Sequence, residues 1–149
     1  MDRGPGGPVS PLGYTAGMRG EYPNKPSHED LDSIEAEHRV QIGMIDALLS
    51  ADEKGLEAAE IDEILVRLLE YTRLHFLSEE LLMRLHAYQH HDEHVFEHRR
   101  MLDELESVRK AHQQDQSDEA AMSVQRLRAR LLGHIHSHDA ELTHFIARR

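Results

Sequence analysis

The sequence predicts an all-α protein: an up-down-up-down antiparallel four-helix bundle with a flexible N-terminal arm. Three observations lead to this fold class. All five prolines lie within the first 26 of 149 residues, and the remainder is rich in Leu, Ala, Glu and Arg, which favour helices. Four later segments repeat apolar side chains every three or four residues. The connections between them are short, and short connections join antiparallel neighbours in a bundle.

The predicted arm is residues 1–27, and the predicted bundle is residues 28–149. The arm contains six of the nine glycines besides the prolines, so it can bury little apolar surface and is expected to be disordered or extended. Docking of the arm to a protein partner is a second interpretation of the same composition.

The first helix is expected over residues 28–49, followed by a loop at residues 50–55. Ser27 could cap it, with Asp30 three residues further on in capping-box position. A histidine interrupts its apolar stripe, which reads Leu31, Ile34, His38, Ile42, Ile45 and Leu49.

The second helix is expected from about residue 56 to about residue 86, and a turn follows in the segment AYQHHD at residues 87–92. Polar residues again interrupt the inward stripe. The stripe consists of Ile61, Leu65, Leu68, Thr72, His75, Glu79 and Leu82.

The third helix is expected over residues 91–112, and the fourth begins after the turn QQDQS at residues 113–117. Ser117 would be the N-cap of the fourth helix, with acidic residues suited to the helix dipole in the first turn. The third stripe reads His94, His98, Met101, Leu105 and Val108, and the fourth reads Val124, Leu127, Leu131, His134, His138, Leu142 and Phe145.

All four stripes contain histidine or carboxylate where a plain bundle would have leucine. Burying such groups without partners costs on the order of a few kcal/mol each. A shared metal site removes this cost, because the metal satisfies all the groups together. Residues four apart lie on one helix face, and two such pairs are His75 with Glu79 and His94 with His98.

The inventory of inward donors is five imidazoles and two carboxylates. His38 comes from the first helix, and His134 with a carboxylate comes from the fourth. Such donors suit iron, zinc, copper or nickel. Seven ligands are too many for one tetrahedral zinc, so a pair of iron ions bridged by carboxylates is the interpretation that fits best.

Four short motifs resemble the hemerythrin family, most closely its single-domain bacterial members. They are IEAEH at 34–38, HFLSEE at 75–80, HVFEH at 94–98 and HIHSHD at 134–139. The family pattern is one histidine, then His-x3-Glu, His-x3-His and His-x4-Asp. This chain matches all of it in order, and the resemblance covers about residues 30–146.

The resemblance implies two iron ions bridged by an oxo or hydroxo group and by the carboxylates of Glu79 and Asp139. One iron would be held by His94, His98 and His134, and the other by His38 and His75. Dioxygen would bind reversibly at an open position on the second iron. The residues that match the family's apolar oxygen pocket are Phe76, Met101, Leu131 and Ile135.

The fourth helix offers two rivals for the last ligand. His138 is four residues after His134 and better phased, whereas Asp139 lies roughly 140° round an ideal helix from His134. Asp139 must therefore reach in from the flank, or the helix must deform locally. We choose Asp139, because a bridge needs two oxygens.

The expected function is reversible binding of dioxygen for storage, delivery or sensing, without catalysis. A di-iron enzyme or scavenger acting on peroxide or nitric oxide is the first alternative, and iron storage or sensing is the second. Met101 stands where the family commonly has phenylalanine, which loosens the pocket and favours the enzyme.

Charge and hydropathy indicate which classes of partner and which cell compartment to expect. The net charge of −11 disfavours nucleic acid, and no apolar run is long enough for a transmembrane helix. The first residues lack the apolar core of a signal peptide and the chain has no cysteine, so we expect a cytoplasmic protein.

Overall fold

The computed structural model describes residues 28–148, which contain helices and no strand. The all-helical prediction is therefore confirmed for this range. The four main helices are α1 (His28–Leu49), α2 (Ala58–Leu85), α3 (His91–Gln113) and α4 (Ser117–His134). Without a break, α4 continues through the π-helix η1 (Ile135–Asp139) into α5 (Ala140–Ala147). The predicted arm and the predicted cap at Ser27 lie outside the described residues.

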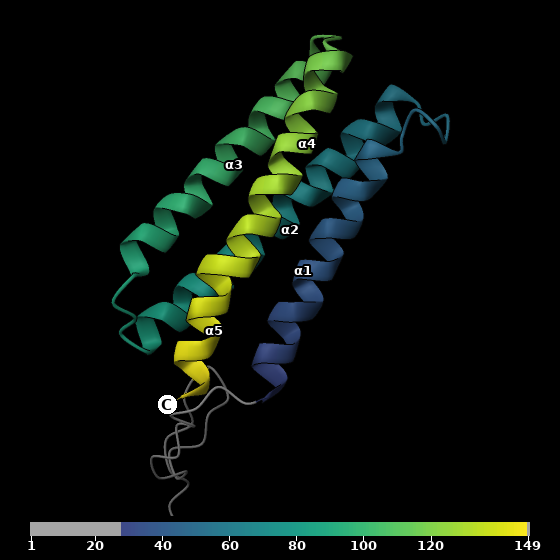
Figure 1. The fold of residues 1–149 in the computed structure, drawn as a ribbon. Helices are drawn as coiled ribbons and strands as arrows, with labels where there is room; N and C mark the ends of the chain where they lie inside the picture. Colours follow the sequence, from purple (N-terminus) through teal and green to yellow (C-terminus); the bar gives the residue numbers. More distant parts are fainter. Residues whose placement is uncertain (1–27, 149) are drawn as a thin grey trace, which may run out of the picture.

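The helices pack side by side around a common interior (Figure 1). Each helix contacts the next one along the chain, and α1 also contacts α4, so the four rods close into a ring. This arrangement turns one stripe of each helix towards the same axis, where side chains from all four can meet.

Turns end the helices close to the predicted positions. The loop after α1 contains Gly55 with φ of 67°, a left-handed conformation that glycine adopts at little steric cost. Ala87 and Asp115 also have positive φ, and they lie in the turns after α2 and α3. The predicted cap at Ser117 is wrong, because Ser117 is already helical and Gln116 is the N-cap.

The core has two apolar clusters with a buried polar layer between them. The larger cluster includes Leu65, Leu68, Met101 and Leu131, and the smaller one consists of Met83, Tyr88, Leu142 and Ile146. Along α2, the residues of the larger cluster precede Glu79 and Met83 follows it. The polar layer is thus closed off by apolar side chains on both sides along the bundle axis.

Two predictions about the stripes need correction. Leu49 is 37% exposed, whereas Leu48 beside it packs against the larger apolar cluster. Gln41 was not placed in the stripe, yet it is completely buried. The outer face of α2 also exposes four leucines at a helical spacing, namely Leu74, Leu77, Leu81 and Leu85.

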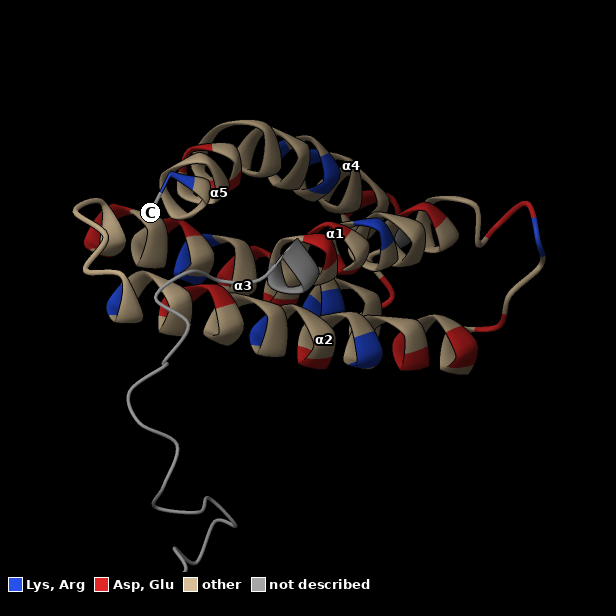
Figure 2. Cartoon of the chain, turned by 90° about the horizontal axis from the view of Figure 1, so that it is seen from below, with Lys and Arg blue, Asp and Glu red and all other residues tan. Residues whose placement is uncertain are grey.

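Acidic and basic residues occur along each of the four long helices (Figure 2). Ion pairs join neighbouring helices, for example Arg128 Nε to Asp46 Oδ1 at 2.7 Å and Arg73 Nη2 to Glu106 Oε1 at 2.5 Å. Exposed pairs of this kind contribute at most about 1 kcal/mol each. Within residues 28–148, no helix combines the length and the apolar character needed to cross a bilayer.

Candidate metal centre

Seven polar side chains meet in the layer between the two apolar clusters, and each is at most 9% exposed. They come from all four rods of the bundle. These are the seven residues that the sequence analysis proposed as metal ligands: His38, His75, Glu79, His94, His98, His134 and Asp139.

The seven residues form two overlapping groups, and within each group the ligand atoms lie within 4.8 Å of one another. Three histidines, His94, His98 and His134, belong to one group, and His38 and His75 belong to the other. Both groups include Glu79 and Asp139. Each group could hold a metal ion, and the shared carboxylates place the two positions next to each other.

The two oxygens of Glu79 face different histidines. Its Oε1 lies 2.7 Å from His75 Nε2 and 3.4 Å from His38 Nε2. Its Oε2 lies 3.0 Å from His98 Nε2 and 3.1 Å from His94 Nε2. One carboxylate thus presents one oxygen to each group, which is the arrangement of a bridging ligand.

Asp139 divides its oxygens in the same way. Its Oδ2 lies 2.9 Å from His38 Nε2, whereas its Oδ1 lies 2.9 Å from His94 Nε2 and 3.0 Å from His134 Nε2. The two carboxylates therefore connect the same two histidine groups.

The donor atoms in this layer fit a bound cation. Many of them are fully buried and make no hydrogen bond within the described chain, although buried polar atoms in proteins are nearly always hydrogen-bonded. A cation would satisfy nitrogen and oxygen lone pairs together. The atoms that lie close to one another at the centre without completing a hydrogen bond are His38 Nε2, His75 Nε2, His134 Nε2, Glu79 Oε1, Asp139 Oδ1 and Asp139 Oδ2.

Opposite charges shift the protonation of these groups in the metal-free chain. Burial by itself would lower the pKa of His38 and of His94, but the carboxylates of Asp139 and Glu79 outweigh it and raise each pKa to about 9. Burial would raise the pKa of both carboxyl groups, but the surrounding histidines hold each pKa below its ordinary value. Protons on histidine thus balance the carboxylate charges when no metal is bound.

Two further carboxylates lie next to the outer ring nitrogens of histidines in the two groups. Glu37 is hydrogen-bonded to His75 Nδ1, and Glu80 Oε1 lies 3.7 Å from His98 Nδ1. Metal-binding histidines commonly donate their second N–H to a carboxylate, which leaves Nε2 free for the metal. Glu37 was missed in the sequence because it is off the inward stripe of α1 and reaches a neighbouring helix.

The π-helix η1 explains how Asp139 reaches the centre. A π turn closes with i→i+5 hydrogen bonds, so residue 139 comes round beneath residue 134. Local deformation was one of two predicted solutions, and it is the one observed. His138 belongs to neither group; its ring stacks on that of His134 at 5.1 Å, and its Nδ1 lies 3.1 Å from Ser137 Oγ.

Three of the four predicted pocket residues, Phe76, Met101 and Leu131, line a small internal cavity of about 10 Å³. Phe76 also stacks on the ring of His98, with centroids 3.8 Å apart. The cavity is not purely apolar, because Gln41 and Thr72 line it too. Nothing in the sequence signalled Gln41 except its position one turn after His38.

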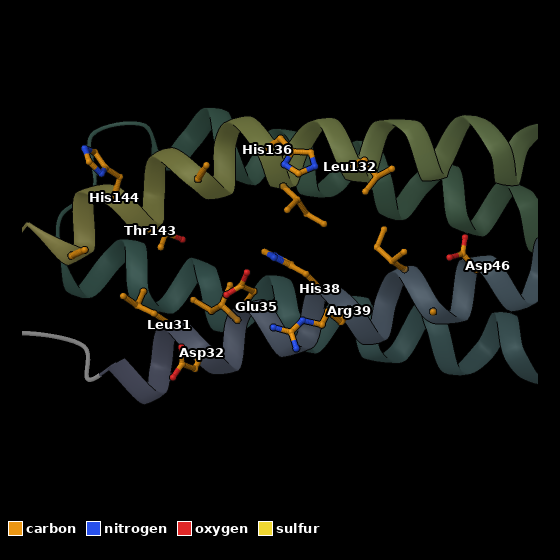
Figure 3. A pocket seen from close by; sticks show the side chains of 16 residues that line it. Leu31, Asp32, Glu35, His38, Arg39, Asp46, Leu132, His136, Thr143 and His144 are labelled. Atoms are coloured by element: carbon orange, nitrogen blue, oxygen red, sulfur yellow. The ribbon is translucent and has the colours of Figure 1, made fainter.

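Ile135, the fourth predicted pocket residue, lines a different space. An open groove of about 840 Å³ runs between α1 on one side and α4 with α5 on the other (Figure 3). His38 lies in the middle of this groove, which leads from solvent to the His38 side of the centre.

No family model, curated protein sequence or solved structure matches this chain. The buried cluster of histidines and carboxylates on a helical bundle is compatible with a hemerythrin and could bind a metal.

Proposed function

We propose that this chain is a non-heme di-iron protein that binds dioxygen reversibly, as its resemblance to the hemerythrin family implies. The observation that carries the proposal is the division of each carboxylate between two histidine groups. A single ion needs no such sharing, whereas two adjacent ions need ligands that reach both.

The donor count assigns unequal roles to the two positions. One ion would be held by His94, His98 and His134, and the other by His38 and His75, with both carboxylates shared. The second ion has one protein ligand fewer, so it keeps a place for an external ligand. The groove beside His38 gives that ion access to solvent.

Bound ferrous ions would supply the electrons that hold dioxygen at this centre. The protein would orient the His75 imidazole through its hydrogen bond to Glu37, and Phe76, Met101 and Leu131 would cover the centre on the side of the larger apolar cluster. Antiparallel alternation of the four helices is part of the same proposal, and the ring of helix contacts with short connections supports it.

Metal analysis with optical spectroscopy tests the proposal. We expect two irons per chain, and an absorption band that appears when the reduced protein meets dioxygen and disappears when dioxygen is removed. His136→Ala is a suitable control, because His136 belongs to the same segment but to neither group. One zinc per chain, or far less than two irons, would contradict the proposal.

A di-iron enzyme acting on peroxide or nitric oxide is the second candidate. The polar groups of Gln41 and Thr72 in the cavity favour it, since a reversible oxygen carrier is best served by an apolar pocket. Rapid oxidation in air, together with turnover of added peroxide, would distinguish this enzyme from a carrier.

A further inference from the structure

One layer of the core lies directly next to the candidate metal centre on the side of the larger apolar cluster. Each of its members stands three residues from an inward histidine, which corresponds to roughly 4.5 Å along a helix. The layer contains Gln41, Thr72, Met101 and Leu131, and the corresponding histidines are His38, His75, His98 and His134. Two of these four side chains can form hydrogen bonds.

Gln41 has a hydrogen-bonding capacity that the described chain leaves unused. It is fully buried, and its Nε2 donates to Thr72 Oγ1 at 3.2 Å. Its carbonyl oxygen, Oε1, is also buried and has no hydrogen-bond partner in the structure. A buried acceptor without a donor carries a free-energy cost that leucine or isoleucine in this place would avoid. A hydrogen-bond donor from outside the chain would satisfy Gln41 Oε1.

The cavity beside Gln41 limits what that donor can be. With a volume of about 10 Å³, it offers room for about one water-sized molecule. Apart from the Gln41–Thr72 pair, its lining is apolar or the thioether of Met101, so hydrogen bonds are available on one side only. The Thr72 hydroxyl accepts from Gln41 and still has its own hydrogen to donate.

We propose that Gln41 and Thr72 form a binding site for one small hydroxyl group, which belongs to water in the resting protein and to one O–H end of hydrogen peroxide in competition with it. The molecule donates an O–H to Gln41 Oε1 and accepts the hydroxyl hydrogen of Thr72. Dioxygen and azide carry no proton and cannot make the first of these bonds. The site therefore selects ligands by whether they can donate a hydrogen bond.

The part of this inference that concerns peroxide rests on the proposed di-iron function, whereas the part that concerns water does not. Two experiments separate them. The first uses the metal-free protein and asks whether a long-lived water contacts the Gln41 side-chain amide and the Thr72 methyl group in NMR cross-relaxation spectra.

For the first experiment, Gln41→Leu removes the acceptor, and Leu127→Ile is the matched control because Leu127 lines the same cavity without polar atoms. We expect the water signal at Thr72 in the parent and in Leu127→Ile, and its loss in Gln41→Leu. Absence of the signal from the parent, or its persistence in Gln41→Leu, would overturn the site. If Gln41→Leu does not fold, Thr72→Val serves instead, because it removes the second hydrogen-bonding group.

The second experiment compares hydrogen peroxide with azide on the iron-loaded protein by the change in absorbance on mixing. Loss of one hydrogen bond in Gln41→Leu should weaken peroxide binding by about tenfold and leave azide binding within about twofold. Equal weakening of both ligands would refute the selection of hydroxylic ligands. Failure of the parent to bind iron would refute the proposed function, and the metal-free result would then decide the water site alone.

Discussion

At the scale of single residues, Glu79 connects the two histidine groups of the candidate centre. Its carboxylate lies within 3.4 Å of the Nε2 atoms of four histidines, two on each oxygen. The side chain is buried, so its charge has no water to stabilise it and depends on these partners. The neighbouring Glu80 only flanks His98 from outside, at 3.7 Å.

Replacement of Glu79 by glutamine should abolish binding of two metal ions. The carboxamide has one oxygen instead of two, so it cannot serve both groups, and it leaves buried imidazoles without their negative partner. We expect less than one ion per chain and a loss of about 3–5 kcal/mol in unfolding free energy. Metal analysis and chemical denaturation measure these effects. Glu80→Gln is the control and should keep both ions; similar losses in the two variants would count against the bridging role.

The metal-free protein should be most stable at mildly acidic pH. The pKa values of His38 and His94 are raised to about 9, so their contribution is complete below about pH 6.5 and is lost as the pH rises through 9. The pKa values of Glu79 and Asp139 are lowered, so theirs is present above about pH 4 and is lost in acid.

Thermal unfolding of the chelator-treated protein against pH checks this expectation. The midpoint should fall between pH 6.5 and 9 by an amount that corresponds to several kcal/mol. With metal bound, low pH should instead destabilise the protein, since protons then compete with the ions for imidazole. A metal-free protein that is equally stable at pH 6 and pH 9 would show that these histidines are not charged in the fold.

At the scale of elements, the π-helix changes the register of the last rod. Inward residues before it follow at Val124, Leu127, Leu131 and His134, and those after it at Asp139, Leu142 and Ile146. The step of five between His134 and Asp139 is the only irregular interval in this series. One extra residue in the wide turn thus keeps both halves of the rod facing the core.

Deleting one residue at Ser137 and inserting one there should therefore have opposite effects on the packing of the last helix. Deleting Ser137 shortens the interval to four, which a regular α-helix accommodates, so helicity and the packing of Leu142 and Ile146 should persist. Inserting one alanine after Ser137 lengthens the interval between His134 and Asp139 to six residues. The side chains of Leu142 and Ile146 then turn about 100° away from the core.

Loss of burial for these two residues should cost about 3–6 kcal/mol, from about 1.5–3 kcal/mol for each apolar side chain. Circular dichroism and thermal unfolding of the two variants test the asymmetry. If the deletion destabilises the protein as much as the insertion, the π turn is not a one-residue insertion in an otherwise regular helix.

At the scale of the whole molecule, the polar layer divides one interior into two apolar clusters. Because all four rods contribute residues to the candidate centre, a bound metal pair would link them at one level of the bundle. Metal binding then contributes directly to the free energy of folding.

Removal of the metal should lower the stability of the bundle by several kcal/mol without unfolding it. The apolar clusters remain on both sides, and proton-mediated pairs between histidine and carboxylate replace part of the lost interaction. Thermal unfolding before and after chelation, with metal re-addition as the control for reversibility, measures the difference. An unchanged midpoint after complete removal would argue against a metal that is shared by four helices.

The sequence by itself predicted the helices and the seven residues that meet in the candidate metal centre. Helical periodicity is a local property, so the stripes that contain His38, His75, His94 and His134 could be traced one helix at a time, and an ordered motif added Asp139. The short connections between the helices likewise limited the possible arrangements.

Only the tertiary structure decided the contacts between helices. The period of one helix does not specify its height or rotation against the next, so Glu37 beside His75 and Gln41 beside Thr72 could not be foreseen. The choice between Asp139 and His138 also depended on the π turn, which brings one side chain inward and turns the other towards the edge. These details arise where four helices must satisfy one shared set of buried charges at once.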